Sequence, residues 1–308
     1  MAEQVLATCT LTKRYGSHTA LDAAGVTVEQ GMIYGLVGRN GAGKTTLIRI
    51  VSGQAEATSG ELFLFGVSEP GKLNKVRRRT GAMVETPSFY PYLTAAENLE
   101  YYRRQRGIPG KKCVQEALDL VGLGDTGKKK FKAFSLGMKQ RLGLGLALMN
   151  HPDFLLLDEP INGLDPEGIV EFRNILLDLN HKRGTTILIS SHIRSELANL
   201  ATHYCFLDKG HVLEEISAAA LREKCRACLQ VTVDDTARAS VVLEQTLGSA
   251  DYEVLPGGVI RLYTCLDHPE TVTSALARHG VAILGVENRG AELEDYFLKL
   301  IGGGVRHA

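Results

Sequence analysis

A glycine-rich turn near the start of the chain restricts the possible fold more than any other segment does. It fits the pattern G-x-x-x-x-G-K-[ST] with one further threonine, and it consists of Gly38, Arg39, Asn40, Gly41, Ala42, Gly43, Lys44, Thr45 and Thr46. Glycines let the backbone wrap closely around a polyphosphate, so that several N–H groups point inward. Lys44 can reach the β- and γ-phosphates, and the Thr45 hydroxyl can bind Mg²⁺. The turn therefore predicts a nucleoside triphosphate site.

The segments around the turn have the pattern that such a site requires. The apolar run 33–37 predicts a strand before the turn, and an apolar helix is expected from Lys44 onward. This order seats phosphate at the positive end of a helix dipole. Later apolar runs are typical of buried parallel strands, and helical patterns separate them. The runs lie at 154–157 and 186–189, and the helical patterns at 135–149 and 166–181. The alternation predicts an α/β domain with a mainly parallel sheet.

Two carboxylates, Asp158 and Glu159, follow the apolar run Leu155–Leu157. We expect Asp158 to hold the Mg²⁺ shell through water and Glu159 to polarise the attacking water. Adjacent carboxylates repel each other, but Mg²⁺ and Lys44 can offset their charge. Taken alone, the pair is equally compatible with a solvated strand end. In combination with the glycine turn, it favours a catalytic role.

The segment Phe134–Arg141 lies ahead of the carboxylates and resembles the signature motif of ABC ATPases. It contains Ser135, Gly137 and Met138 at the expected start of a helix, where a hydroxyl and a glycine amide can clamp a γ-phosphate. Taken alone, Ser135 is equally a simple helix cap. The resemblance implies that these three residues bind the nucleotide of a second, head-to-tail subunit.

Other motifs follow in the order of the same family. The resemblance implies that Tyr15 stacks on adenine, that Asp165 ends a D-loop, and that His192 is the switch histidine that senses the γ-phosphate. Glu85 stands where most relatives carry the glutamine of the Q-loop. A carboxylate can still bind Mg²⁺ and act in catalysis, but it lacks the amide donor and adds negative charge near phosphate.

The resemblance covers about residues 4–220 and implies the P-loop NTPase fold of the ABC ATPase type. Its parts are a mainly parallel sheet core, an antiparallel β subdomain and an α-helical subdomain at about 86–150. We expect this nucleotide-binding domain to occupy residues 1–220. Residues 221–308 are expected to form a small C-terminal α+β accessory domain of βαββαβ type, which supports dimerisation, regulates or only stabilises.

The implied activity is ATP hydrolysis, with ATP and Mg²⁺ as cofactors, at the interface of two ATPase subunits. The second subunit is a copy of this chain or a paralogue, and an integral membrane permease subunit is the further partner. The segment Glu85–Thr94 resembles the E-loop of bacitracin-resistance and lantibiotic-immunity exporters, which predicts export of an antimicrobial peptide. Alternatives are a general multidrug exporter ATPase, an importer ATPase and a soluble regulatory ABC protein.

The aromatic residues Phe89, Tyr90 and Tyr92 follow Glu85. Exposed aromatic side chains beside a nucleotide sensor would suit docking of a helix of the membrane subunit. The alternative interpretation is that they pack inside the helical subdomain.

Charge and hydropathy restrict the partners and the location. Lysine plus arginine and aspartate plus glutamate both number 35, so we expect no nucleic acid partner. Neither a membrane span nor a signal peptide is evident. We therefore expect a cytoplasmic protein, and the resemblance implies that it is bound peripherally to the cytoplasmic face of a bacterial membrane. The pair Cys225 and Cys228 forms a lone C-x-x-C, interpreted as two ordinary thiols at a helix-to-strand junction.

Overall fold

The structure is a computed structural model that describes residues 3–84, 88–191, 197, 199–266, 268–289, 296, 300 and 301. The chain forms two compact units, Met1–Ala218 and Ala219–Ala308. Glu85 and His192 lie outside the described residues.

A six-stranded sheet forms the centre of the first unit. Its strand order is β5-β6-β7-β3-β8-β9, and all neighbours are parallel except the antiparallel pair β8 and β9. The strands β3, β6 and β7 are buried at every residue, as expected for parallel strands covered on both faces. The strands are β3 (Ile33–Gly38), β5 (Thr80–Met83), β6 (Phe154–Asp158), β7 (Thr186–Ser191), β8 (His203–Asp208) and β9 (His211–Ser217).

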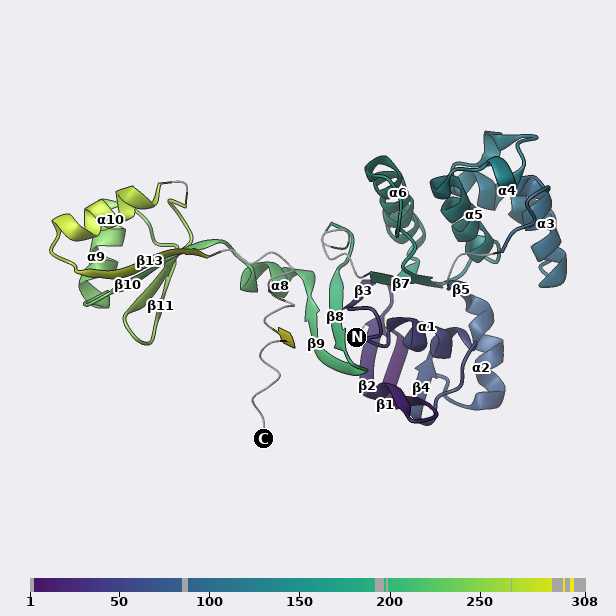
Figure 1. Ribbon diagram of the computed structural model, residues 1–308, viewed down its shortest axis with the longest axis horizontal. Coiled ribbons are helices and arrows are strands. Elements are labelled where there is room, and N and C mark those ends of the chain that lie inside the picture. Colours follow the sequence, from purple (N-terminus) through teal and green to yellow (C-terminus); the bar gives the residue numbers. More distant parts are fainter. Residues whose placement is uncertain are drawn as a thin grey trace. The chain divides into compact units, whose positions relative to one another are not determined.

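A second sheet, antiparallel and in the order β2-β1-β4, belongs to the same unit. Helix α1 packs between the two sheets, and helix α6 covers the other face of the parallel sheet (Figure 1). Apolar side chains of both sheets and α1 form one core, which includes Leu6, Leu36 and Leu47. These elements are β1 (Gln4–Tyr15), β2 (His18–Glu29), α1 (Lys44–Ser52), β4 (Ser59–Leu64), α2 (Pro70–Val76), η1 (Arg77–Arg79) and α6 (Pro166–Arg183).

A helical part follows β5, in agreement with the predicted α-helical subdomain. Its first helix begins at a capping box, in which Thr94 and Glu97 each accept a hydrogen bond from the other's backbone N–H. Its elements are α3 (Ala95–Gln105), α4 (Lys112–Leu120), η2 (Gly124–Thr126), η3 (Phe131–Ala133) and α5 (Leu136–Leu148). Figure 1 shows α3, α4 and α5 gathered beside the β5 edge of the sheet.

The aromatic residues after Glu85 divide between the two interpretations. Phe89 is buried and packs against Tyr102 and Phe131, with ring centroids 5.7 and 5.1 Å away. Tyr90 and Tyr92 remain 44% and 71% exposed. The prediction that all three aromatics form an exposed groove was therefore wrong for Phe89, because its ring fills the core of the helical part.

The second unit has the order β-α-β-β-α-β, which confirms the βαββαβ prediction. Its antiparallel sheet has the strand order β11-β12-β10-β13, and both helices contribute to one apolar core with that sheet. The elements are α8 (Ala218–Lys224), which starts at the unit boundary, β10 (Cys228–Val233), α9 (Thr236–Thr246), β11 (Tyr252–Leu255), β12 (Val259–Leu262), α10 (Pro269–Arg278) and β13 (Ile283–Arg289).

Cys225 follows α8 directly, and Cys228 is the first residue of β10. Within the described residues no group of His, Cys, Asp and Glu side chains could hold a metal ion. The position of the pair at a helix-to-strand junction agrees with the prediction. None of the helices in the described ranges has the length and apolar character needed to cross a bilayer.

Candidate nucleotide-binding site

The glycine turn joins the buried strand β3 to helix α1, as the sequence predicts. Gly41 and Gly43 have φ angles of 81° and 108°, which favour glycine. A Cβ at position 43 would also lie 2.6 Å from the carbonyl oxygen of Ala20. The turn therefore lies in close contact with the β1–β2 hairpin. Position 43 requires glycine because of both its φ angle and this close contact.

Lys44 is the first residue of α1, and its side chain is only 4% exposed. Its Nζ atom donates hydrogen bonds to the carbonyl oxygens of Gly38 at 2.7 Å and Arg39 at 3.2 Å. The same Nζ lies 3.3 Å from Oε1 of Glu159. A buried ammonium group is stable only where hydrogen bonds and an opposite charge compensate its lost hydration. These contacts hold the cation against the turn that is expected to cradle phosphate.

Asp158 ends β6, and each of its carboxylate oxygens accepts a hydrogen bond from a hydroxyl group. Thr45 Oγ1 donates to Oδ2 at 2.7 Å, and Ser190 Oγ donates to Oδ1 at 2.6 Å. Hydroxyl and carboxylate oxygens are the ligands that hard divalent cations prefer. The adjacent oxygens of Thr45 and Asp158 therefore fit a Mg²⁺ ion, although they touch each other directly here.

Glu159 follows in an unusual backbone conformation, with φ at 45° in a residue other than glycine. Its N–H donates to Ser190 Oγ at 2.9 Å, and its side chain is 24% exposed. Left-handed backbone at such a residue costs energy and is most often found at functional sites. The carboxylate thus faces Lys44 from a position that the backbone would not adopt by itself.

These side chains border a cavity of about 700 Å³, within the range of roughly 300–1,000 Å³ that is usual for small-molecule sites. Tyr15, the expected adenine contact, is 46% exposed, and Lys13 Nζ lies 4.8 Å from its ring centroid. Tyr15 therefore keeps an open ring face for stacking. The lining residues are Tyr15, His18, Ala20, Asn40, Gly41, Ala42, Gly43, Lys44, Thr45, Thr46, Met83, Leu136, Gln140, Asp158, Glu159 and Asn162.

Several of these lining residues were not predicted from the sequence, notably His18, Met83 and Gln140. Gln140 is 6% exposed, and its Oε1 atom has no hydrogen-bond partner among the described residues. Its spacing of three from Gly137 on a helix was the available signal, because residues three apart share a helix face. No signal within the sequence marked His18, which reaches the cavity through the β1–β2 hairpin.

Ser135, Gly137 and Asp165 do not border this cavity. They line a second one, of about 410 Å³, between the start of α5 and the start of α6. Ser135 Oγ accepts a hydrogen bond from Met138 N at 3.3 Å, and Asp165 Oδ1 accepts one from Gly168 N at 2.9 Å. Both residues are therefore N-caps, and they line a different cavity from the one that Lys44 and Glu159 border.

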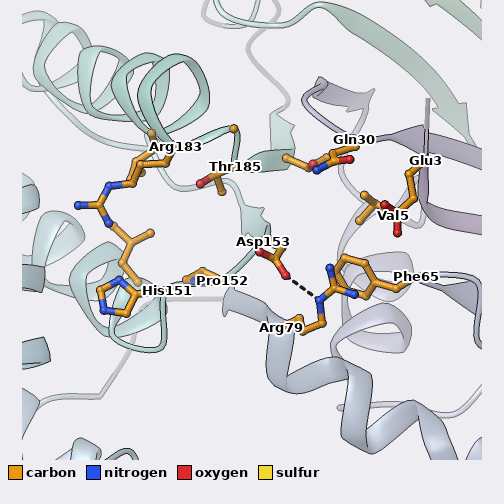
Figure 2. A pocket seen from close by; sticks show the side chains of 14 residues that line it. Glu3, Val5, Gln30, Phe65, Arg79, His151, Pro152, Asp153, Arg183 and Thr185 are labelled. Carbon is orange, nitrogen blue, oxygen red and sulfur yellow. Dashed lines mark hydrogen bonds and ion pairs between the residues drawn. The ribbon is translucent and has the colours of Figure 1, made fainter. Parts of the chain in front are cut away.

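A third cavity, of about 230 Å³, lies at the opposite, amino-terminal edge of the parallel sheet. Figure 2 shows Arg183 and His151 on one side of it and Glu3 and Gln30 on the other. Arg79 donates to Asp153 at 2.6 Å, and the guanidinium of Arg79 lies 3.9 Å from the ring centroid of Phe65. The charged groups that line this third cavity are half-exposed and of both signs. Among the described residues, the cavity therefore has no feature that would select a nucleotide.

Comparison with known proteins gives consistent results. The ABC transporter family matches residues 21–162. The chain is 43% identical to the bacitracin transport ATP-binding protein BcrA of Bacillus licheniformis, over 98% of each chain. It is 40% identical to the lantibiotic transport ATP-binding protein SrtF of Streptococcus pyogenes, over 67% of this chain and 87% of that one. The dimeric structure of MJ0796, a bacterial ABC transporter cassette, matches with a TM-score of 0.62 at 25% identity and covers 69% of this chain and 98% of that chain.

Proposed function

Because the chain belongs to the ATP-binding proteins of ABC transporters, we propose that it is the ATP-hydrolysing subunit of a bacterial exporter. The observation that carries the proposal is the grouping of Lys44, Thr45, Asp158 and Glu159 around one cavity. The cargo is an antimicrobial peptide of the bacitracin or lantibiotic type, a proposal supported by the two transport proteins that the chain resembles. The subunit works at the cytoplasmic face of the membrane with a separate permease.

The residues of the cavity have different roles in ATP hydrolysis. The glycine turn 38–43 and Thr46 surround the phosphates, Lys44 neutralises them, and Tyr15 stacks on the adenine. Thr45 and Asp158 would hold Mg²⁺, with Glu85 as a further ligand from the Q-loop position. Bound Mg²⁺ would stabilise the negative charge that develops on the phosphate oxygens.

Glu159 is the general base in this proposal. Its carboxylate accepts a proton from the attacking water, while Lys44 holds the carboxylate near the phosphates. His192 and Glu85 report whether the γ-phosphate is present. Loss of the γ-phosphate removes contacts on both sides of the site, which shifts the protein to a second state.

The second half of the site comes from another ATPase subunit. Ser135, Gly137, Met138 and Asp165 lie at helix starts outside the nucleotide cavity, where an anion is favoured by the helix dipole. The dimeric MJ0796 structure supports this arrangement. A copy of this chain or a paralogue would place these residues against the γ-phosphate in a head-to-tail pair.

The permease is proposed to dock on the helical part of the first unit. Tyr90, Tyr92 and Tyr101 are exposed there, and Lys132 Nζ lies 4.7 Å from the ring centroid of Tyr92. Exposed aromatic side chains are typical contact residues of protein interfaces. Their place in the chain, directly after the sensor position Glu85, would couple docking to the nucleotide.

We assign the nucleotide-binding domain to residues 1–220 and the accessory domain to 221–308. The compact units of the structure divide two residues earlier, after Ala218. The accessory domain is proposed to support the dimer or regulate it. Helices α9 and α10 both pack into the core of this domain, and the phosphate-binding motifs all lie in the first unit.

The substitution Glu159→Gln tests the proposed function. It removes the base but keeps the size of the side chain, so we expect hydrolysis to fall on the order of a hundredfold or more, while ATP still binds. Phosphate release and nucleotide binding are measured on the purified chain, and resistance to bacitracin and to a lantibiotic is measured in cells that co-express the permease.

The matched control is Glu116→Gln, the same chemical change at a half-exposed carboxylate that faces His151. It should leave both the ATPase rate and the resistance unchanged. Full ATPase activity of the Glu159→Gln variant would contradict the role of Glu159. An active ATPase that confers no peptide resistance with any permease tested would contradict the exporter assignment alone.

A further inference from the structure

Ser190 is a buried polar residue in the centre of the parallel sheet. It lies on β7, where it pairs with Leu36 of β3 and with Asp158 of β6. Its side chain is 0% exposed. The serine thus lies between the strand that carries the glycine turn and the strand that carries the two carboxylates.

The hydroxyl group of Ser190 joins two functional residues at once. It donates to Oδ1 of Asp158 at 2.6 Å and accepts from the N–H of Glu159 at 2.9 Å. A hydroxyl carries one hydrogen and two lone pairs, so it can make both bonds simultaneously. Because one partner is a carboxylate, the first bond belongs to the stronger, charge-assisted class.

The second bond acts on a strained peptide. Glu159 has φ at 45°, a conformation that persists only where the surroundings enforce it. The bond from its N–H to Ser190 is one such enforcing contact. It fixes the direction in which the Glu159 side chain leaves the strand, and that direction places Oε1 3.3 Å from Lys44 Nζ.

We propose that Ser190 is a positioning residue for ATP hydrolysis, because its hydroxyl fixes the orientation of both Asp158 and Glu159. The inference rests on the proposed ATPase function and adds a residue to it. Ser190 does not reach the nucleotide cavity itself. Its effect passes through Glu159, which must be aimed at the attacking water, and through Asp158.

The variant Ser190→Ala removes both bonds while adding no bulk. We expect kcat to fall about tenfold to a hundredfold, since a misplaced base loses transition-state stabilisation. The KM for ATP should change by less than about threefold, because the glycine turn and Lys44 remain. Ser190→Thr keeps the hydroxyl and should recover most of the rate.

A second measurement needs no nucleotide. Removal of the acceptor should speed amide hydrogen exchange at Glu159 about tenfold or more in Ser190→Ala, and the Thr variant should restore protection. A third measurement combines variants. Because Ser190 acts partly through Glu159, Ser190→Ala should cause a smaller further loss of hydrolysis in a Glu159→Gln background than it causes in the wild type.

The matched control is Thr8→Val, at another buried hydroxyl that bridges two strands. Thr8 Oγ1 donates to Ala24 O at 3.0 Å and accepts from Val26 N at 2.9 Å, far along the chain from the carboxylates. This variant should lower Tm about as much as Ser190→Ala does, with kcat unchanged.

The possible outcomes distinguish a failure of the Ser190 inference from a failure of the proposed ATPase function. A wild-type chain without ATPase activity would overturn the proposed function and the inference together. An active wild type whose kcat survives Ser190→Ala would overturn the inference alone. So would a full additional loss in the Glu159→Gln background, or a loss of kcat in Thr8→Val equal to that in Ser190→Ala.

Discussion

The two ends of the parallel sheet each border a cavity, yet only one of them has the features of a nucleotide site. At the carboxyl edge, Lys44 and Asp158 are at least nine-tenths buried and are held by several hydrogen bonds. At the amino edge, Arg79 and Asp153 are 49% and 56% exposed and pair mainly with each other. Both ends therefore carry charge, but only the carboxyl edge holds charge away from water.

The difference between the two edges shows what burial of charged side chains contributes to a site. A buried lysine or aspartate destabilises the fold unless hydrogen bonds and opposite charges compensate its lost hydration. The hydrogen bonds around Lys44 and Asp158 therefore serve to keep these charges in the site. An exposed ion pair is screened by water and contributes little. The cavity at the amino edge is thus a gap where elements meet. The buried charged groups at the carboxyl edge are instead arranged for a ligand that carries charges opposite to theirs.

The largest effect is expected for Lys44→Met. This change removes the buried charge and keeps most of the volume, so ATP hydrolysis should fall on the order of a hundredfold to a thousandfold. ATP affinity should fall too, because the lysine contacts phosphate in the ground state. Phosphate release and calorimetric ATP binding measure the two effects. A nearly unchanged ATPase rate would contradict the claim that only the carboxyl edge of the sheet has the features of a nucleotide site.

The smallest effect is expected for Arg79→Ala at the amino edge. The pair with Asp153 and the contact with Phe65 are half-exposed, so we expect a loss of about 1 kcal/mol in the free energy of unfolding. The ATPase rate should not change. Urea unfolding and phosphate release check both points, and a tenfold loss of rate would mean that the amino edge takes part in the reaction.

The sequence predicted the parts of the site that are continuous in the chain. The glycine turn, Thr45 and the adjacent pair Asp158 and Glu159 each carry their chemistry within a few residues, and short motifs of this kind can be read directly. The buried strands were predicted equally well, because an uninterrupted apolar run suits a parallel strand covered on both faces.

What the sequence could not predict depends on partners that are distant in the chain. The two bonds of Ser190 require the register that pairs it with Asp158, and no local pattern specifies that register. Phe89 and Tyr90 are adjacent aromatics, yet only the fold decides that the first is buried.

The most direct test of the account is to mix two inactive variants, Lys44→Met and Gly137→Asp. Among the described residues, a Cβ at Gly137 would meet Leu164 Cδ2 alone, at 3.9 Å, so an aspartate fits the fold. We expect it to act through the nucleotide of the facing subunit. In a head-to-tail pair, a mixed dimer contains one site with both an intact turn and an intact signature helix. The mixture should recover about a quarter of the wild-type ATPase rate. A mixture as inactive as either variant alone would contradict a site shared between two subunits.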